Sequence, residues 1–374
     1  MQFTGGQTGP VICVMRGRLV RICVYAISKN EELFVERCIR SAADADLFVL
    51  CDTGSTDRTV ELARGAGATV YDITVRPWRF DHARNIAMGL IPSDVDVCIS
   101  LDVDEVLEPG WRQHIEQHWR PNTTSMRVLF DWGGGVFGQT RIHSRHGWMW
   151  RHPCHEALYL DSRVAGRPTD LNVLLLRHLP DPTKSRAQYL DLLRAGATED
   201  PFCSRNSFYY ARELTYHRLW AEAVTELERY LALPTAVWPA ERALVARLLG
   251  DACEALNRGD AALEWYKRGT SEDPLRREPW VALADAMYRR SQWSECLAAA
   301  MKALQIVDFR TTWPNDATAW GWKPHDLAAI AAYRLGHADL AVTQGRLALE
   351  YAPADQRLNT NMKFYEELAR GKPE

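Results

Sequence analysis

The sequence predicts an α/β domain with a mostly parallel sheet, followed by an all-α solenoid of helical repeats. Between about residues 19 and 110, short β-rich runs alternate with helical patterns, which is typical of a parallel sheet covered by helices. From about residue 187 onward the chain consists of Ala- and Leu-rich amphipathic segments with few β-rich runs. A length of 374 residues suits two domains. We expect a flexible lead-in over 1–18, an α/β domain over 19–185 and a repeat domain over 186–374.

Four β-rich runs with helical segments between them make up the predicted α/β domain. The predicted strands are LVRICVYAI, DLFVLCD, ATVYDITV and VDVCISLD, and the predicted helices are KNEELFVERCIRSA, STDRTVELARGAG and DHARNIAMGLI. This alternation implies strands that run in the same direction. Ligands of such sheets bind at the carboxyl ends of the strands, and Asp52 and Asp102 each end a predicted strand. We therefore expect a binding site at that edge.

Four segments of the C-terminal half are similar to one another. Each has a small residue at the same place, namely Ala223, Ala262, Cys296 and Ala341, at intervals of 39, 34 and 45 residues. Spacing near 34 with a small, aromatic and proline pattern resembles tetratricopeptide helix pairs. We expect three or four imperfect repeats, interrupted by a Trp-rich insert at 308–324, whose role the sequence leaves open and for which we favour packing, for example between subunits.

The composition excludes some classes of protein and favours a cytoplasmic one. Apolar residues make up 47% of the chain, charged residues 25%, and the formal net charge is −3. The chain has no separate basic domain, so its composition does not point to a nucleic-acid backbone as a partner. Nine cysteines occur without CxxC pairs, which indicates core thiols in a reducing compartment. No apolar run is long enough to span a bilayer, and the opening residues lack the pattern of a signal peptide. We expect a soluble, cytoplasmic protein without a membrane partner.

Two polar motifs lie near the ends of predicted strands: one follows a strand, and the other begins a helix. In LCDTGSTDRT, Asp52 precedes a glycine turn, and the hydroxyl residues after it are good helix-capping types. Capping explains the later residues but not Asp52. In WRFDHARNIAM, Arg84 and Asn85 lie at the start of a helix, where an anion binds readily. A capped helix with a salt bridge is the alternative explanation for Arg84.

The motif LDVDE places three carboxylates, those of Asp102, Asp104 and Glu105, directly after a strand. Like charges repel, so a positive partner or solvent must offset them. In an extended segment Asp102 and Asp104 share one face while Val103 points away. Two carboxylates on one face suit Mg²⁺ or Mn²⁺, with nucleotide phosphates as further ligands. A solvated acidic loop is the alternative.

Taken in order, the motifs ISKNEE (27–32), DTGSTD (52–57), DHARN (81–85) and LDVDE (101–105) resemble family 2 glycosyltransferases of the GT-A fold. The helical repeats that follow narrow the resemblance to SunS-like glycosyltransferases of bacteria and phages. The resemblance implies a Rossmann-like GT-A domain, a nucleotide-sugar donor that we expect to be a UDP-sugar, and inversion at the anomeric carbon. It also implies Mn²⁺ or Mg²⁺ as cofactor.

The resemblance also implies roles for individual residues. Asp52 would contact the base or ribose, Arg84 the diphosphate or sugar, and Asp102 the ribose or sugar. Asp104 would bind the metal that bridges the diphosphate, and His178, at the end of a later β-rich run, resembles a second metal ligand. The implied donor-binding residues are Ile27, Asn30, Glu32, Asp52, Arg84, Asn85, Asp102 and Val103.

An inverting transfer needs a base on the side of the anomeric carbon opposite the leaving group. The family places an acidic residue after a glycine-containing loop downstream of the metal motif. Here Gly147 lies in that loop, and Glu156 is the candidate base, with neighbouring His155 as the alternative base or ligand. The nearby basic run is a candidate site for the diphosphate or an acidic acceptor, or else a solvated strand face. It comprises Arg141, His143, Arg145, His146, Arg151 and His152.

The leading hypothesis is a metal-dependent inverting glycosyltransferase of the hexosyltransferase type (EC 2.4). Its acceptor is a peptide side chain or a glycan, since repeat solenoids present concave surfaces that suit peptides. A hydroxymethylated base of phage DNA is an alternative acceptor, favoured by the basic run. A hypothesis of another class is a non-catalytic repeat scaffold with a degenerate α/β domain. Formation of a homodimer through the repeat domain is also left open.

Overall fold

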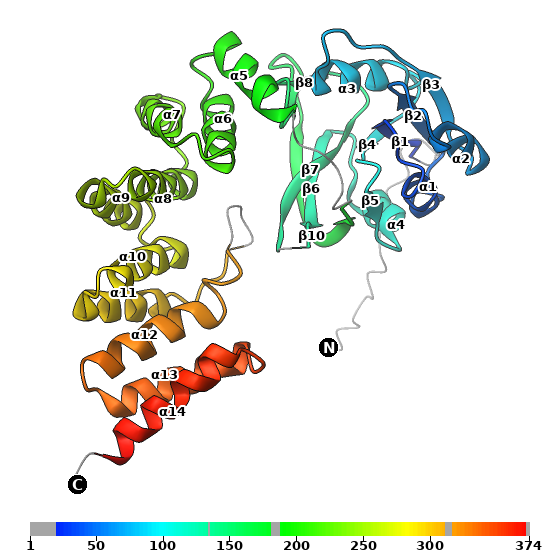
Figure 1. Ribbon diagram of the computed structural model, residues 1–374. Coiled ribbons are helices and arrows are strands. Elements are labelled where there is room, and N and C mark those ends of the chain that lie inside the picture. The colour runs from blue at the N-terminus through cyan, green and yellow to red at the C-terminus, as the bar shows by residue number, and fades with distance from the viewer. Residues whose placement is uncertain (1–19, 134, 181–187, 311–315, 372–374) are drawn as a thin grey trace, which may run out of the picture. The chain divides into compact units, whose positions relative to one another are not determined.

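The computed structural model describes residues 20–133, 135–180, 188–310 and 316–371, and divides the chain into two compact units between residues 186 and 187 (Figure 1). The first unit is α/β and the second is all-helical. The two-part architecture is therefore confirmed. The predicted lead-in at 1–18 lies outside the described residues.

The α/β unit is built on an eight-stranded sheet in the order β3-β2-β1-β4-β7-β6-β10-β5. Its strands are β1 (Ile22–Ser28), β2 (Leu47–Asp52), β3 (Thr69–Asp72), β4 (Val97–Ser100), β5 (Glu105–Leu107), β6 (Thr123–Asp131), β7 (Val136–Ser144) and β10 (Arg167–His178). The first four strands are parallel to one another, as the alternating pattern predicts. In the other half β6 and β10 are parallel, whereas β7 and β5 are antiparallel to their neighbours, so that the complete sheet is mixed.

Side chains that alternate along the buried strands pack into a separate core on each face of the sheet. One face is covered by α1 (Val35–Ser41), α2 (Thr59–Gly65) and α4 (Trp111–His118). The other is covered by α3 (Phe80–Gly89) and by a separate two-stranded hairpin of β8 (Trp148–Arg151) and β9 (Ala157–Leu160). The hairpin matters for the site because the turn between its strands carries Glu156.

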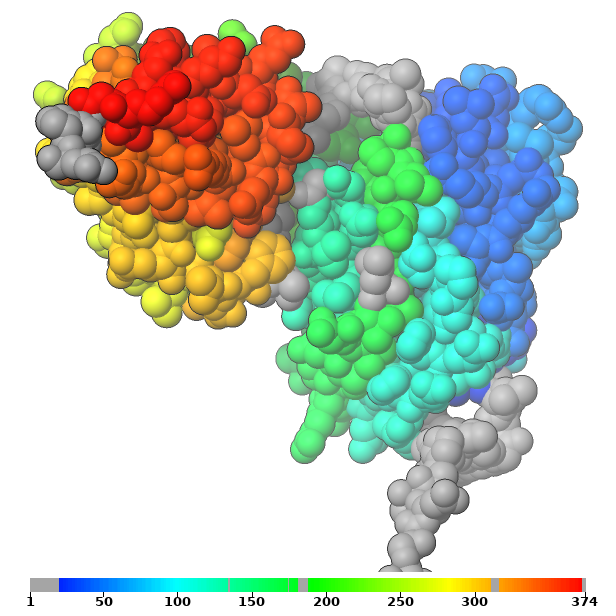
Figure 2. Space-filling view, turned by 90° about the horizontal axis from the view of Figure 1, so that it is seen from below, coloured from blue at the N-terminus to red at the C-terminus, as the bar shows by residue number. Residues whose placement is uncertain are grey.

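The second unit is a stack of antiparallel helix pairs (Figure 1). Its helices are α5 (Tyr189–Glu199), α6 (Ser204–Tyr216), α7 (Trp220–Ala232), α8 (Pro239–Ala255), α9 (Gly259–Glu272), α10 (Arg277–Arg289), α11 (Trp293–Gln305), α12 (Trp322–Arg334), α13 (Ala338–Tyr351) and α14 (Gln356–Arg370). Each pair packs on the next, and Figure 2 shows the continuous surface of α12 to α14, coloured orange to red. The predicted repeat architecture is confirmed.

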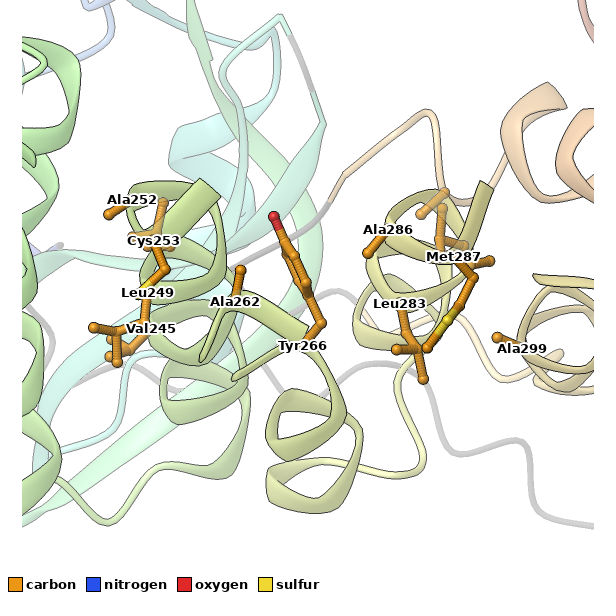
Figure 3. Close-up of a cluster of buried hydrophobic side chains, with 14 of the residues drawn as sticks. Val245, Leu249, Ala252, Cys253, Ala262, Tyr266, Leu283, Ala286, Met287 and Ala299 are labelled. Carbon is orange, nitrogen blue, oxygen red and sulfur yellow. The ribbon is translucent and has the colours of Figure 1, made fainter. Parts of the chain in front are cut away.

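Small residues let the two helices of each pair approach closely. The four equivalent positions Ala223, Ala262, Cys296 and Ala341 lie in α7, α9, α11 and α13, and all four side chains are fully buried. Figure 3 shows Ala262 beside Tyr266 in the core that α8, α9 and α10 share. The sequence repeat therefore marks the second helix of each pair.

The described part of the Trp-rich insert packs within the solenoid. The indole N–H of Trp320 donates to Glu278 at 2.9 Å, and the Arg277 guanidinium lies 4.1 Å from the centre of its ring. Trp322 begins α12 beneath Arg357. These two side chains thus pack inside the helical unit itself, whereas Trp313 lies outside the described residues.

The described cysteines are free thiols, and all except the half-buried Cys203 are buried, in agreement with the expected core role. None of the helices in the described ranges is at once long and apolar enough to cross a lipid bilayer.

Candidate active site at the carboxyl edge of the sheet

Asp52 ends β2 and organises the turn that follows it. Its buried carboxylate accepts hydrogen bonds from the backbone N–H groups of Gly54 (3.0 Å) and Ser55 (2.8 Å) and from the hydroxyls of Ser28 (3.0 Å) and Ser55. Gly54 has a φ of +101°, a conformation that glycine adopts without strain. Asp52 therefore has a local structural role that its place in the sequence did not reveal, and its contact with a nucleoside stays a prediction.

The loops after β1 and β2 are tied together and carry the predicted donor residues Asn30 and Glu32. The Oδ1 atom of Asn30 accepts from the backbone N–H of Thr56 at 2.8 Å. A carboxylate oxygen of Glu32 accepts from the backbone N–H of Arg58 at 3.1 Å. Ile27, at the end of β1, packs in the core beneath α3. Two motifs that are separate in the sequence thus form one structural unit at the carboxyl edge.

The acidic motif is a turn and not an extended segment, which corrects one premise of the metal prediction. The backbone N–H of Glu105 donates to the carbonyl oxygen of Asp102 at 2.9 Å, and the Glu105 carboxylate accepts from the backbone N–H of Asp102 at 2.9 Å. Val103 is buried in the core beneath α1, α2 and α4, so its side chain is not available to a nucleotide-sugar donor. Because the chain turns here, Asp102 and Asp104 meet different partners.

Two buried arginines offset three carboxylates of the edge. Arg84, from α3, pairs through Nη2 with Asp102 and through Nε with Glu156. Arg141, from β7, places Nη2 3.1 Å from Oδ2 of Asp102 and 2.8 Å from Oε1 of Glu105. Ion pairing within the protein therefore compensates Asp102 and Glu105.

Burial and charge act in opposite directions on the groups of this cluster. Burial disfavours a charged Asp102, but Arg84 and Arg141 outweigh it and hold the pKa of Asp102 well below its usual range. Burial raises the pKa of Glu105 to about 7, against the attraction of Arg141. For Arg84, burial is outweighed by Asp102 and Glu156, which raise the pKa of the guanidinium. Arg84 is thus a fixed positive charge.

All three nitrogens of the Arg84 guanidinium have partners, because Nη1 also donates to the Ser100 hydroxyl at 3.2 Å. The predicted contact of Arg84 with a diphosphate would have to replace one of these bonds. The Glu156 side chain is 11% exposed, and the adjacent His155 has a φ of +52° in the same turn. The structure therefore brings the candidate base and Asp102 to the same guanidinium.

Asp104 and His178 are brought together from distant parts of the chain. Asp104 follows the turn after β4, His178 ends β10, and the Nε2 atom of His178 lies 3.3 Å from Oδ2 of Asp104. The hydrogen bond that His178 donates to the Asp104 carboxylate raises the pKa of His178, although burial opposes this. Two ligand atoms each about 2.1 Å from one ion and at right angles lie about 3 Å apart, so this spacing fits a shared cation. Within the described ranges, no group of three or more His, Cys, Asp and Glu side chains could hold a metal ion.

The basic run around β7 and β8 does not form one patch. Besides Arg141, Arg145 donates to the carbonyl oxygen of Ile91, and the imidazole of His146 lies 3.2 Å from the carbonyl oxygen of Ser93. Arg151 and His152 both contact Tyr159. These side chains are distributed over different parts of the unit, so the run is not a prepared surface for a diphosphate or nucleic acid.

A buried hydrogen-bonded chain beneath the edge was not expected from the sequence. The indole N–H of Trp150 donates to the Tyr25 hydroxyl at 2.9 Å, and that hydroxyl lies 2.8 Å from Nε2 of His143. The Nδ1 atom of His143 lies 2.8 Å from the carbonyl oxygen of Ser144. A neutral imidazole that donates from Nδ1 and accepts at Nε2 satisfies every member of this chain.

We expect His143 to make the α/β unit less stable as the pH falls from about 6.5 to about 4, whereas buried Glu105, whose pKa is raised to about 7, acts in the opposite direction. Burial, assisted by nearby Arg145, lowers the pKa of His143 to about 4, whereas an unfolded histidine titrates near 6.5. Below 6.5 the His143 of the unfolded chain therefore binds a proton that it does not bind in the folded chain, and this titration alone makes unfolding easier by roughly 3 kcal/mol across the window. Hydrogen exchange of β1 amides at pH 7 and pH 4.5 measures the change. His143→Gln should lose less stability than the parent chain over this range, and exposed His118→Gln should behave like the parent chain; equal pH dependence in all three proteins would contradict the assignment.

Comparison with known proteins assigns the first unit. The sequence model of glycosyl transferase family 2 matches residues 23–180, which span β1 to the end of β10. Residues 23–180 form a family 2 glycosyltransferase domain. An uncharacterized glycosyltransferase of Rickettsia bellii is 33% identical over 98 residues, which cover 26% of this chain and 32% of that protein. The family domain thus contains every candidate site residue named above.

The second unit has tetratricopeptide-like relatives. A TPR repeat-containing protein of Synechococcus elongatus is 29% identical over 114 residues, which cover 30% of this chain and 27% of that protein. The chain spans only about a third of the curated relatives that it matches. Among solved structures, YrrB, described as a TPR protein with an unusual peptide-binding site, has a TM-score of 0.39 at 12% identity and covers 48% of this chain and 84% of its own. MamA has a TM-score of 0.36 at 15% identity, with 43% and 85% covered.

Proposed function

We propose that the chain is a metal-dependent inverting glycosyltransferase that uses a nucleotide sugar, with a UDP-sugar as the expected donor. The observation that carries this proposal is the pairing of Asp104 with His178 at the carboxyl edge of a family 2 glycosyltransferase domain. The two side chains supply only part of a coordination shell, and the oxygens of a donor diphosphate would supply more. A carboxylate and an imidazole together suit Mn²⁺ better than Mg²⁺, which prefers oxygen ligands.

The remaining residues suggest how the transfer proceeds. The acceptor hydroxyl, amine or thiol attacks the anomeric carbon, the bond from that carbon to the diphosphate breaks, and the nucleoside diphosphate leaves. The bound cation would stabilise the charge that develops on the leaving group. Glu156 is the candidate that takes the acceptor proton, and its pairing with Arg84 holds its carboxylate in place. Asp102 shares that arginine and is the candidate contact for the ribose or sugar.

The acceptor we propose is a peptide side chain or a glycan. The alternative acceptor, a hydroxymethylated base of DNA, drew its support from the basic run, and the described members of that run are dispersed among internal partners. The scaffold hypothesis keeps one argument, because Arg84 and Arg141 explain the clustered carboxylates Asp102 and Glu105 without any ligand. Asp104 and His178 are the residues that set the two hypotheses apart.

A panel of nucleotide sugars with Mn²⁺ tests the proposal. A ligand that binds only the native state raises the melting temperature, so the donor should produce a shift that disappears with EDTA. The same donor should be hydrolysed slowly by the full chain without any acceptor. Calorimetry with UDP should give heat that depends on added Mn²⁺. If no nucleotide sugar shifts the melting temperature and UDP gives no such heat, the scaffold hypothesis is supported instead.

A further inference from the structure

The candidate base lies on an element that is not part of the main sheet. Glu156 is in the turn of the β8–β9 hairpin, whose two strands pair only with each other among the described strands. The turn includes two residues with positive φ, His152 at +82° and His155 at +52°. A hairpin of two short strands is marginally stable alone, so contacts with the rest of the unit must fix its position.

Asn85 makes the most specific of these contacts. Its side-chain Nδ2 donates to the carbonyl oxygen of Trp150 at 2.9 Å, and its Oδ1 accepts from the backbone N–H of Trp150 at 2.9 Å. The side-chain amide of Asn85 thus binds both the backbone N–H and the backbone carbonyl of Trp150, as a residue of a neighbouring strand would. One turn earlier along the chain, the backbone N–H of Phe80 donates to the carbonyl oxygen of Pro153 at 3.0 Å. Phe80, which begins α3, and Asn85, in the middle of that helix, therefore anchor the hairpin at two points.

Trp150 connects this anchor to the ion pair of the site. Its side chain is 4% exposed, and the Arg84 guanidinium lies 5.0 Å from the centre of its ring. The indole N–H is fixed from below by its bond to Tyr25. A displacement of β8 would move the Trp150 ring that the Arg84 guanidinium contacts. It would thereby also move the Nε atom of Arg84, which pairs with Glu156.

We propose that Asn85 and Trp150 are positioning residues, which set Arg84 against Glu156, and that Asn85 does not contact the donor. This inference rests on the proposed function, because it holds that Asn85 and Trp150 position the hairpin so that Glu156 can take the acceptor proton. It replaces the role implied by the sequence, in which Asn85 binds the donor. The reason is geometric: both the oxygen and the nitrogen of the Asn85 amide already bind the backbone of β8.

The variant Asn85→Ala tests this with three measurements on the full chain. Hydrogen exchange of amides in 148–160 should be at least about tenfold faster, because both bonds to Trp150 are lost. The turnover number for hydrolysis of the most reactive UDP-sugar should fall by about 100-fold, as expected when a catalytic group moves by about 1 Å. The dissociation constant for UDP with Mn²⁺ should stay within about twofold, because donor contacts are untouched.

Two further variants make the result interpretable. Asn85→Asp keeps an acceptor for the Trp150 N–H but loses the donor, so its exchange and turnover should lie between those of the other proteins. Ile86→Ala changes the adjacent exposed residue of α3 and should leave all three measurements unchanged. The inference is overturned if Asn85→Ala weakens UDP binding about tenfold while exchange in 148–160 stays as in the parent chain. An inactive parent chain that binds no nucleotide overturns the proposed function itself.

Discussion

Asp104→Asn is expected to lower metal-dependent hydrolysis of a UDP-sugar by at least about 100-fold, because a cation at the leaving group stabilises the transition state by several kcal/mol. Asparagine has nearly the same shape, so the turn after β4 should persist. The charge that would attract a cation beside His178 is lost. Calorimetry with UDP should then show little heat that depends on Mn²⁺.

Glu108→Gln is the matched control for this change. Glu108 is another carboxylate near the same edge, but it pairs with Arg177 and has no proposed role in the reaction. Its variant should bind UDP with Mn²⁺ and hydrolyse the donor like the parent chain. If Asp104→Asn keeps both properties as well, the metal site is not at Asp104.

Arg84→Met is expected to destabilise the α/β unit by about 3–5 kcal/mol, because it removes one partner from a buried group of charges. Methionine fills part of the space above Trp150 but leaves Asp102 with Arg141 alone and removes the pairing with Glu156. The free energy of opening, measured by hydrogen exchange of β1 and β4 amides, reports on this unit separately from the solenoid.

Two comparisons separate charge from shape in this prediction. Arg84→Lys keeps the positive charge but cannot reach both carboxylates in the forked geometry, so its loss should be smaller than that of Arg84→Met. Arg40→Met removes an exposed arginine that pairs with Glu36 four residues earlier, and should cost less than about 1 kcal/mol. A loss for Arg84→Met as small as that for Arg40→Met would mean that the ion cluster does not stabilise the fold.

Sequence patterns predicted the local parts of the fold well. Alternating strands and helices predicted the parallel half of the sheet, because a helix between two strands lets the chain return and enter the next strand in the same direction. The helix pairs followed from equivalent small residues such as Ala262. The antiparallel strands β7 and β5 were not predicted, because β5 is only three residues long and the β7 segment VFGQTRIHS is too polar to be recognised as a strand from its sequence.

The candidate site was predicted residue by residue but not in its arrangement. Placing Asp102 and Asp104 on one face assumed an extended backbone, whereas a turn closed by Glu105 separates them. The ion pair of Asp102 with Arg141 joins β7 to the acidic motif and leaves no local signal in the sequence. Likewise, Asn85 was expected at a helix start, where anions bind, whereas it lies in the middle of α3 and binds the backbone of β8.

The connection between α11 and α12 contains the Trp-rich insert, yet these two helices still pack on each other. Stacked pairs derive their stability from their nearest neighbours, so extra chain in one connection need not disturb the pairs on either side. Evolution can therefore change the length of this connection more freely than its end at Ala319 and Trp320, which packs in the core of the solenoid. Related chains should differ more in the length of this connection than in the number of residues within their helices.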